Sequence, residues 1–545
     1  MTGDDDDDCH KHDEPTVIIV GAGIAGLAAA YRLCRSPAPD NNHNKQQQFH
    51  VTIVEAADRI GGRVWPYRHD NGSSSSSTAI GIDLGGQWLH EGGRRNPIRN
   101  VLKELGLRLK RYPPGFDKRT NYNAVTGQPL DAKLLRRARK LCQTHLKECI
   151  RQYQSSSVGI DKDTSQQELV NELLQTLRDN ENTADSSSST SSSLLRQYIR
   201  YSLYTTECYE GCSLRDMSVL LDDIYQEFSG DDEMIEGGYE ALLDKLMDTI
   251  QPHTTLLLNS VVETIQYNNN NNNDSSSGGG VQVRLQNGDT IHGDYCVCTV
   301  SIGVLQQRRV GFVPDLPVSR WEAVDSIGMG TLNKVLLVFA SVFWHQQECF
   351  GTMHPTDPTQ HKLFFDGSVE YNGQPALLVL LASDASYRVD PKSTMTTSSS
   401  TTTLHHDDDD NKHSDCGGST DNCPSSSSTP ASAAAVETCM TDSAIVNECL
   451  GTLQTVFGKD TVTELRYSKV TRWNSNPLTC GAYSFTKVGC AEEAYDEIER
   501  PLGRLRFAGE ATSKTNHATV HGAWMTGERE AERLFQDEKE RQTSR

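Results

Sequence analysis

Three glycines near the start of the chain have the spacing of a dinucleotide-binding turn. Gly21, Gly23 and Gly26 follow the apolar run Val17–Val20, which suits a buried parallel strand. In such a turn the first glycine allows the bend, the second lets the backbone approach a pyrophosphate, and the third lets the next helix pack on the strand. The helix expected over Ile24–Leu33 would direct its N-terminal amides at the phosphates. Strand, turn and helix together predict a nucleotide site.

A carboxylate and an arginine extend this predicted site. Glu55 ends a second apolar strand, expected over Val51–Val54, where its carboxylate can accept hydrogen bonds from ribose hydroxyl groups. The usual gap after the last glycine is about 20 residues. The longer gap here contains the polar stretch Ser36–Gln48, which we expect to form a surface loop. Arg63 follows a second glycine pair and would supply a cation near the phosphates.

A lysine lies in an otherwise apolar stretch in the middle of the chain. Lys334 falls within Leu332–Phe339, which we expect to be a strand, as we do Ala376–Ala382. Burying an ammonium group without a partner is costly. The residue therefore either reaches solvent from an edge strand or serves a function inside a site.

The composition limits the class of protein. The chain has 545 residues, enough for two or more domains, and a formal net charge of −21. Part of this charge comes from Asp4–Asp8 and Asp407–Asp410, which we interpret as solvated acid rather than as an attractor of a cationic substrate. The acidity argues against nucleic acid as a partner.

Cysteine usage and the termini indicate a compartment. The 15 cysteines are odd in number and scattered, without a doubled metal-ligand pattern, so the sequence predicts no metal site. A reduced, cytoplasmic chain fits this usage. The N-terminus lacks a hydrophobic signal region, the C-terminus lacks a Ser-Lys-Leu peroxisomal address, and no apolar stretch reaches the ~20 residues of a membrane helix. We expect a monomer without a membrane segment.

Polar low-complexity stretches interrupt the chain and cannot bury enough apolar surface to order themselves. We interpret them, with the tail at 1–13, as unfolded segments or loop insertions: Ser73–Ser77, 181–193, Asn268–Gly280 (268–280) and 393–435. Between them, helical periodicity marks Pro129–Tyr153 and Thr164–Arg178. The middle of the chain is therefore predicted to be a sheet with helices.

Several motifs resemble, in order, those of the flavin amine oxidase family. EAADRIGGR (Glu55–Arg63) is similar to its continuation of the FAD fingerprint, and FSGDDEMIEGGYEALLDKL (Phe228–Leu246) to its re-entry into the FAD domain. LNSVVETI (Leu258–Ile265) resembles its adenine-side strand, and TIHGDYCVCTVSIGVL (Thr290–Leu305) a later strand and turn. FAGEAT (Phe507–Thr512), followed by a helix from about residue 521, resembles its C-terminal flavin segment.

The resemblance implies an α/β fold with two discontinuous domains. A Rossmann-like FAD-binding domain would collect 14–115, 229–312 and 478–537, and a mixed-sheet, helix-covered substrate domain would collect 116–228 and 313–477. The implied cofactor contacts are Gly21, Gly23, Gly26, Glu55, Arg63, Gly86, Gln87, Trp88, Val262, Glu510 and Thr519.

The family oxidises C–N bonds: hydride passes from the carbon beside an amine to the flavin, the imine hydrolyses, and oxygen re-oxidises the flavin to give hydrogen peroxide. By resemblance, Lys334 would hold a water against the flavin ring, and His90 would help to select a charged amine. Trp473 and Tyr483 would wall the substrate face, and Glu91 would bind a distal ammonium group. Each has an alternative: a structural histidine for His90, core packing for the two aromatic residues, and a solvated acid for Glu91.

Subfamily features favour polyamine and spermine oxidases of the animal type. Ala482 falls where monoamine oxidases carry the cysteine that attaches FAD, so non-covalent FAD is expected, and Thr519 falls where they carry a second tyrosine. The substrate would be spermine, spermidine or an N-acetylpolyamine.

Two other functions stay open. A histone demethylase of the same fold would carry an extra N-terminal helical domain and a long two-helix arm. Few residues precede Val17, and the mid-chain helices are expected to be short. An inactive flavoprotein scaffold is the third possibility, against which Lys334, Trp473 and Tyr483 argue together.

Overall fold

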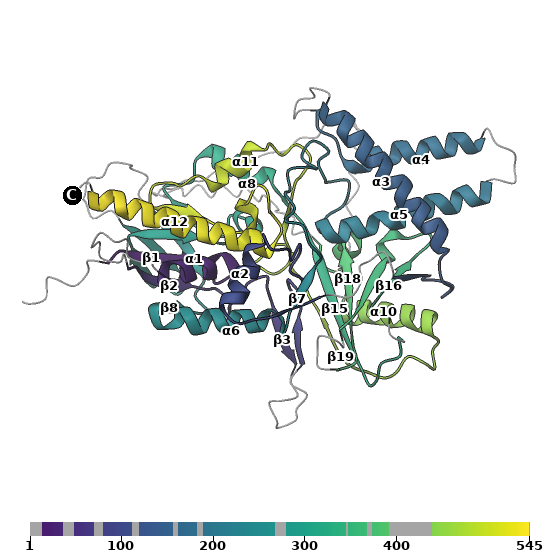
Figure 1. The fold of residues 1–545 in the computed structure, drawn as a ribbon, viewed down its shortest axis with the longest axis horizontal. Helices are drawn as coiled ribbons and strands as arrows, with labels where there is room; N and C mark the ends of the chain where they lie inside the picture. The colour runs from purple at the N-terminus through teal and green to yellow at the C-terminus, as the bar shows by residue number, and fades with distance from the viewer. Residues whose placement is uncertain are drawn as a thin grey trace, which may run out of the picture.

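The computed structural model describes residues 14–35, 48–69, 80–111, 119–155, 162–182, 189–267, 280–344, 347–367, 373–391 and 439–543 (Figure 1). The predicted segments at 1–13, Ser73–Ser77 and 393–435 lie outside these residues, as do most of Asn268–Gly280 and nearly all of Ser36–Gln48. Of the predicted insert 181–193, residues 183–188 lie outside, whereas the rest is helical, which corrects the expectation of an unfolded insert there. Within the described ranges, no helix combines the length and apolar character that crossing a bilayer demands.

A five-stranded parallel sheet joins segments from both ends of the chain. Its strands, in spatial order, are β21 (Leu505–Phe507), β12 (Tyr295–Cys298), β1 (Thr16–Val20), β2 (His50–Val54) and β8 (Thr254–Leu257). Parallel neighbours need crossover connections, which here are long because other structure is inserted between the strands. The predicted α/β fold, with a Rossmann-like sheet built from distant segments, is confirmed.

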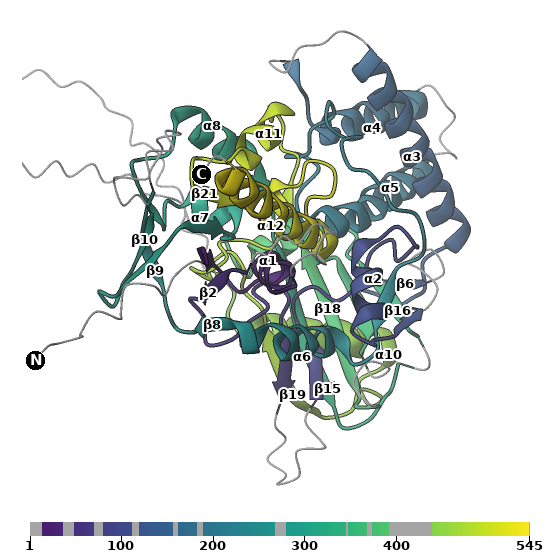
Figure 2. The same cartoon turned by 60° about the vertical axis from the view of Figure 1, so that its left-hand side comes forward.

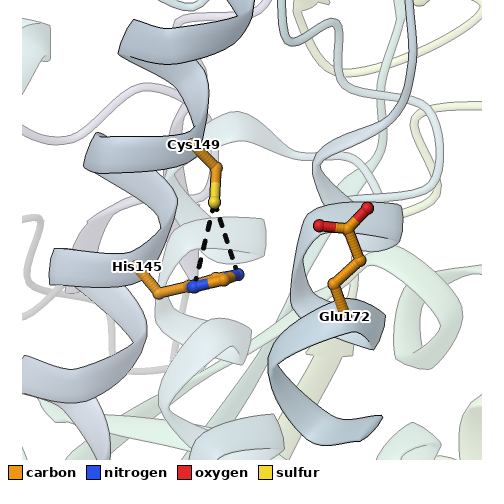
Figure 3. A group of neighbouring side chains, drawn as sticks. All are labelled: His145, Cys149 and Glu172. Atoms are coloured by element: carbon orange, nitrogen blue, oxygen red, sulfur yellow. Dashed lines mark hydrogen bonds between the residues drawn. The ribbon is translucent and has the colours of Figure 1, made fainter. Parts of the chain in front are cut away.

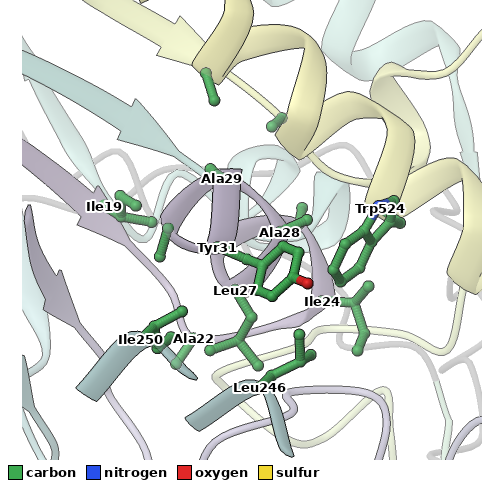
Figure 4. Close-up of a cluster of buried hydrophobic side chains, with 14 of the residues drawn as sticks. Ile19, Ala22, Ile24, Leu27, Ala28, Ala29, Tyr31, Leu246, Ile250 and Trp524 are labelled. Atoms are coloured by element: carbon green, nitrogen blue, oxygen red, sulfur yellow. The ribbon is translucent and has the colours of Figure 1, made fainter. Parts of the chain in front are cut away.

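Three helices pack against this sheet: α1 (Ile24–Cys34), α6 (Gly238–Ile250) and α12 (Val520–Thr543). Figure 4 shows α1 between Leu246 and Ile250 of α6 and Trp524 of α12. α1 and α12 approach closely because Gly527 has no side chain: a Cβ there would lie 2.1 Å from the carbonyl oxygen of Ala25. Each large apolar side chain buried here stabilises the domain by about 1.5–3 kcal/mol.

The second large sheet of the molecule has six strands and is mixed. Its spatial order is β19 (Leu465–Val470), β15 (Leu332–Phe339), β18 (Ala376–Ala382), β17 (Lys362–Asp366), β16 (Cys349–Met353) and β6 (Thr120–Asn123). The strands predicted over Leu332–Phe339 and Ala376–Ala382 are confirmed. Both are central strands and almost wholly buried, which explains their continuous apolar runs. All six strands fall within 116–228 and 313–477, and the exact domain boundaries stay a prediction.

Helices cover the second sheet and extend beyond it (Figures 1 and 2). They include α3 (Ala132–Ser155), α4 (Gln166–Asn182), α5 (Ser189–Glu210) and α10 (Asp442–Phe457). The expectation of short mid-chain helices is wrong: α3 has 24 residues, α4 has 17 and α5 has 22. The serine-rich start of α5 concealed its helical pattern.

The stretch Leu258–Ile265, predicted as one strand, contains the end of one connection and the start of another strand. β8 ends at Leu257, Asn259 turns with φ 53°, and β9 (Val262–Gln266) joins a different sheet. The remaining strands are β3 (Pro66–His69), β4 (Ile80–Asp83), β5 (Leu109–Arg111), β7 (Glu233–Ile235), β10 (Val281–Leu285), β11 (Thr290–Gly293), β13 (Gly311–Val313), β14 (Gly328–Met329) and β20 (Ser484–Phe485). The remaining α-helices are α2 (Pro97–Glu104), α7 (Ile302–Gln306), α8 (Val318–Ser326), α9 (Ser383–Tyr387) and α11 (Glu493–Glu499).

Candidate active site

A cavity of about 1680 Å³ is lined by residues of both sheets and their loops. It extends from the glycine turn after β1 to the start of β15, and the C-terminal segment around Glu510 also contributes. Of the residues that the sequence predicted for the site, Gly26 alone does not line this cavity. Ligand sites of α/β sheets lie beyond the carboxyl ends of the strands, which is where β1 and β2 deliver Gly21 and Glu55.

The glycine turn is shaped to admit a pyrophosphate. Gly21 has φ 104°, a left-handed backbone conformation that suits glycine. A Cβ on Gly26 would lie 2.0 Å from the carbonyl oxygen of Gly21, whereas a Cβ on Gly23 would meet nothing within 4 Å. Gly23 is the N-cap residue of α1 and has no side chain to cap the first amides of the helix. These amides therefore face the cavity uncapped. These residues fit a dinucleotide.

Glu55 is buried at the cavity wall and organises the loop around it. Its Oε2 accepts a hydrogen bond from the amide of Ala22 at 2.6 Å, and its Oε1 accepts one from the amide of Ala57 at 2.8 Å. Val262, at the start of β9, lines the cavity close to this end of the sheet. The carboxylate therefore supports the glycine turn in addition to facing the space for a ribose.

Arg63 and Glu510, which lie 447 positions apart in the sequence, form a partly buried ion pair with Nη1 and Oε1 separated by 2.7 Å. The second carboxylate oxygen of Glu510 accepts hydrogen bonds from Ser484 Oγ at 2.6 Å and from the amide of Ala518 at 2.8 Å. Although burial favours the neutral acid, the charge of Arg63 and these hydrogen bonds hold the pKa of Glu510 below its ordinary value. The pair joins the second glycine-rich turn to the C-terminal segment.

Lys334 is a buried lysine with polar partners. It lies on β15, only 2% exposed, in a strand with neighbours on both sides, so the edge-strand alternative is wrong. Its Nζ donates to the carbonyl oxygens of Asp83 at 2.9 Å and Gly85 at 2.8 Å, and to Oε1 of Gln87 at 2.7 Å. The ammonium group also lies 5.5 Å from the ring centroid of Trp88. These contacts offset much of the cost of burying the charge.

Aromatic side chains line the cavity near Lys334. Trp88 packs against Phe365, with ring centroids 5.3 Å apart, and Trp473 packs edge-on against Trp65 at 5.9 Å. The hydroxyl group of Tyr483 donates to the carbonyl oxygen of Cys208 at 3.0 Å, which turns the polar end of this residue toward α5. Their apolar ring faces remain available to wall a ligand.

His90 and Glu91 lie on the loop after Trp88 and are both held by neighbouring backbone or acid groups. Nδ1 of His90 lies 3.2 Å from Oδ2 of Asp232, and Oε2 of Glu91 accepts from the amide of Phe228 at 2.6 Å. Burial opposes ionisation of Asp232, but the His90 ring and the amide of Glu91 hold the pKa of Asp232 below its ordinary value. The half-exposed His90 therefore faces an ionised carboxylate.

Thr519 and Gly86 contribute to the cavity wall mainly through the backbone around them. Oγ1 of Thr519 donates to the carbonyl oxygen of Asn516 at 2.8 Å and accepts from the amide of Gly522 at 2.9 Å, which fixes the start of α12. Ala482 lines the cavity and has no thiol for a covalent link to a cofactor.

Sequence reasoning missed a group of acids around the cavity. They come from three separate parts of the chain: the end of α5, the segment between α5 and β7, and the residue before β16. They are Glu210, Asp222, Glu227, Asp231, Asp232 and Glu348. Burial, with the nearby charge of Asp222, raises the pKa of Glu210 to about 7. The clustering of acid was hidden in a chain that is acidic throughout.

The fold and cavity are those of a nucleotide-binding protein whose cavity also has aromatic and acidic side chains in its lining. The family model described as "Flavin containing amine oxidoreductase" matches residues 24–535. The chain belongs to this family, is an oxidoreductase, and has FAD as its cofactor. The family resemblance and the FAD expected from the motifs are thereby confirmed.

The chain is 29% identical over 98% of its length to "Lysine-specific histone demethylase 1 homolog 3" of Arabidopsis thaliana, and covers 31% of that protein. It is 26% identical over 95% of its length to "Lysine-specific histone demethylase 2" of Homo sapiens, and covers 53% of it. The chain thus spans about a third to a half of the length of these relatives. A solved structure of putrescine oxidase bound to putrescine has a TM-score of 0.62 at 17% identity, with 96% of this chain and 99% of that chain covered. This likeness supports the fold.

Proposed function

We propose that this chain is an FAD-dependent polyamine oxidase, which oxidises a secondary amine of spermine, spermidine or an N-acetylpolyamine and passes the electrons to oxygen. The observation that carries the proposal is one cavity whose lining combines a glycine turn suited to a dinucleotide with aromatic side chains and several acids. A long polycation fits such a chamber, since its reacting nitrogen can lie between apolar walls while its other ammonium groups face carboxylates.

The cofactor half of the cavity would hold the nucleotide through backbone and a few charges. Gly21, Gly23 and the N-terminus of α1 would receive the pyrophosphate, Glu55 the ribose hydroxyl groups, and Val262 the adenine side. Bound FAD supplies the hydride acceptor. Arg63 would face the cofactor while Glu510 keeps its guanidinium in place.

In this proposal Lys334 holds and orients a water molecule at the amine side. Two of its three acceptors, the carbonyl oxygens of Asp83 and Gly85, are backbone atoms, whereas the third is the Gln87 side chain. If the Gln87 side chain turns away, Nζ keeps two fixed partners and directs its third N–H at a water in the cavity. Such a water would be positioned to hydrolyse an imine or to assist re-oxidation.

Substrate selection would come from the chamber walls. Trp473 and Tyr483 would pack on the aliphatic chain, and Thr519 would contribute to the same cavity wall. The ionised Asp232, with His90 and Glu91, would attract a distal ammonium group. Neutralising this cluster removes an electrostatic contribution and leaves the apolar walls intact.

A second candidate function is oxidation of a methylated lysine in a basic peptide. It is favoured by the near full-length similarity of this chain to proteins named as lysine-specific histone demethylases. A lysine-rich peptide is also an extended polycation, so the acidic rim suits both substrates. Comparing polyamine and peptide substrates in one experiment distinguishes the two candidate functions.

The experiment mixes the flavin-loaded protein without oxygen with spermine, N-acetylspermine, putrescine and a dimethyl-lysine peptide, and records the rate of flavin bleaching. A trimethyl-lysine peptide is the matched control, because its quaternary nitrogen has no lone pair with which to form an imine. Bleaching by spermine or its acetyl derivative with a second-order rate constant at least tenfold above that of the dimethyl peptide supports the polyamine assignment. Bleaching by the dimethyl peptide alone contradicts it and supports the second candidate, and no bleaching by any amine favours an inactive scaffold.

A further inference from the structure

Three potential metal ligands from two helices converge away from the cavity described above. His145 and Cys149 lie one turn apart on α3, and Glu172 reaches toward them from α4 (Figure 3). One ligand atom of each, an imidazole nitrogen, the sulfur and a carboxylate oxygen, lies within 4.8 Å of the other two. His145 and Cys149 are partly buried and Glu172 is exposed, so solvent and ions can reach the group. None of the three lines the active-site cavity.

The separations are close to those of a tetrahedral site. Sγ of Cys149 lies 3.8 Å from Nδ1 and 3.5 Å from Nε2 of His145. Zinc bonds of about 2.3 Å to sulfur and 2.0 Å to nitrogen, at a tetrahedral angle, place the two ligand atoms roughly 3.5 Å apart. The distance from Sγ to Nδ1 is slightly longer than this separation, so a small adjustment of the two α3 side chains would admit zinc. A carboxylate oxygen of Glu172 lies within 4.8 Å of the sulfur and of an imidazole nitrogen.

The histidine is also oriented as a metal ligand would be. Nε2 lies 2.9 Å from the carbonyl oxygen of Leu169, so we assign the ring proton to Nε2. Nδ1 then carries the lone pair that a metal needs. Metal-binding histidines commonly donate their other ring N–H to a backbone carbonyl in this manner. Leu169 belongs to α4, so this hydrogen bond already joins the two helices.

The chemistry of the donors selects the ion. A thiolate and an imidazole suit zinc, whereas magnesium and calcium prefer oxygen ligands throughout. Glu148 and Glu172 both place negative charge near the thiol, which favours a cation at this point. We propose that His145, Cys149 and Glu172 form a zinc-binding site, completed by water, that clamps α3 to α4.

The clamp would act on a helix that reaches the active-site cavity. α4 begins at Gln166, whose side chain lines the cavity and donates to Asp222 Oδ1 at 2.6 Å. Glu172 lies less than two turns further along the same helix. Zinc would therefore hold this end of α4 in place and stabilise the folded chain, because it binds the folded arrangement and not the unfolded one.

The test uses the full-length, flavin-loaded protein, stripped of metal by a chelator and dialysed against zinc alone. We expect one zinc per chain by elemental analysis, with one sulfur ligand in its X-ray absorption spectrum. Cys149→Ser and His145→Asn should each weaken zinc binding at least tenfold, and Glu172→Gln should weaken it less. Cys439→Ser is the matched control, since Cys439 is an exposed free cysteine elsewhere, and it should leave zinc binding unchanged.

A variant that misfolds would not obscure the result, because the parent protein gives a second readout. Zinc should slow alkylation of Cys149 in the parent, measured by peptide mass spectrometry, while the rate at Cys439 stays the same. Absence of stoichiometric zinc, a zinc spectrum without sulfur, or full zinc binding by a folded Cys149→Ser variant would overturn the proposal. Equal protection of Cys149 and Cys439 would also overturn it.

Discussion

The part of the cavity proposed for the cofactor and the part proposed for the amine are built by different means. On the cofactor half, backbone dominates: Gly21, Gly23 and Gly26 are close in sequence, and what matters is the side chain that they lack. On the amine half, side chains from distant segments converge, and Lys334 on a buried strand contacts Asp83, at the end of β4 and 251 positions earlier. The cofactor half is therefore sensitive to added atoms, whereas the amine half is sensitive to the loss of charges and hydrogen bonds.

The largest effect is expected from a single methyl group in the glycine turn. Gly26→Ala places a Cβ 2.0 Å from the carbonyl oxygen of Gly21, so the backbone must shift, at a cost of about 3 kcal/mol in unfolding free energy. Gly23→Ala adds the same methyl where nothing lies within 4 Å. It should leave the melting temperature of the flavin-free protein unchanged but reduce flavin retention. Thermal unfolding and flavin absorbance after dialysis measure the two effects, and equal melting temperatures for both variants would contradict this view.

The second-largest effect is expected from removing the buried charge of Lys334 on the amine half. Lys334→Met should leave FAD bound but lower the rate of flavin turnover roughly 100-fold, because the group proposed to hold the water is lost. Lys362→Met is the matched control: Lys362 is equally buried, on β17, and its Nζ is paired with Glu448 at 2.7 Å outside the cavity. It should reduce stability with little change in turnover. Stopped-flow reduction and re-oxidation measure both variants, and similar turnover in the two would remove Lys334 from the mechanism.

A buried histidine beside the second sheet makes stability depend on pH. Burial, with the charges of Lys362 and His354, lowers the pKa of His361 to about 3. The unfolded chain takes up the proton first as pH falls below about 6.5, so the stability present above that pH is progressively lost toward pH 3. Each pH unit in this range costs about 1.4 kcal/mol for one such histidine.

His361→Gln should remove that share of the pH dependence while keeping an acceptor for the amide of His354, which now donates to Nδ1 at 3.1 Å. Denaturant unfolding at pH 6 and pH 5 measures how steeply the unfolding free energy falls with pH in the parent and in the variant. Because His521 also has a lowered pKa, about 4, the variant should retain part of the dependence. Identical slopes in parent and variant would show that His361 is not kept neutral.

The smallest effect is expected at the rim of the chamber. Asp232→Asn removes the charge that faces His90 while preserving the side-chain shape. Since partly exposed ion pairs contribute about 1 kcal/mol or less, we expect KM for a polycationic amine to rise a few-fold with kcat unchanged. Steady-state kinetics at low and high salt measure this, and the difference between parent and variant should shrink as salt screens the charge. A fall in kcat alone would assign Asp232 a different role.

The sequence predicted those elements whose structure depends on interactions between neighbouring residues. The glycine turn, β1, β2 and α1 were predictable because a backbone turn, an apolar run and helical periodicity depend on neighbouring residues. The bounds of β15 and β18 followed from apolar runs that only central strands can bury. In contrast, α5 was missed because its first turns are serine-rich, and Leu258–Ile265 was joined into one strand across a turn at Asn259.

The sequence by itself determined a glycine-rich turn of the kind that binds a dinucleotide, and a series of motifs shared with the flavin amine oxidases. Only the tertiary structure decided which groups surround that turn: the three acceptors of Lys334, the pairing of Arg63 with Glu510, and the meeting of His145 and Cys149 with Glu172. The physical reason is that conformational preferences act over a few residues, whereas these partners meet only when the packing of apolar strands and helices brings distant segments together.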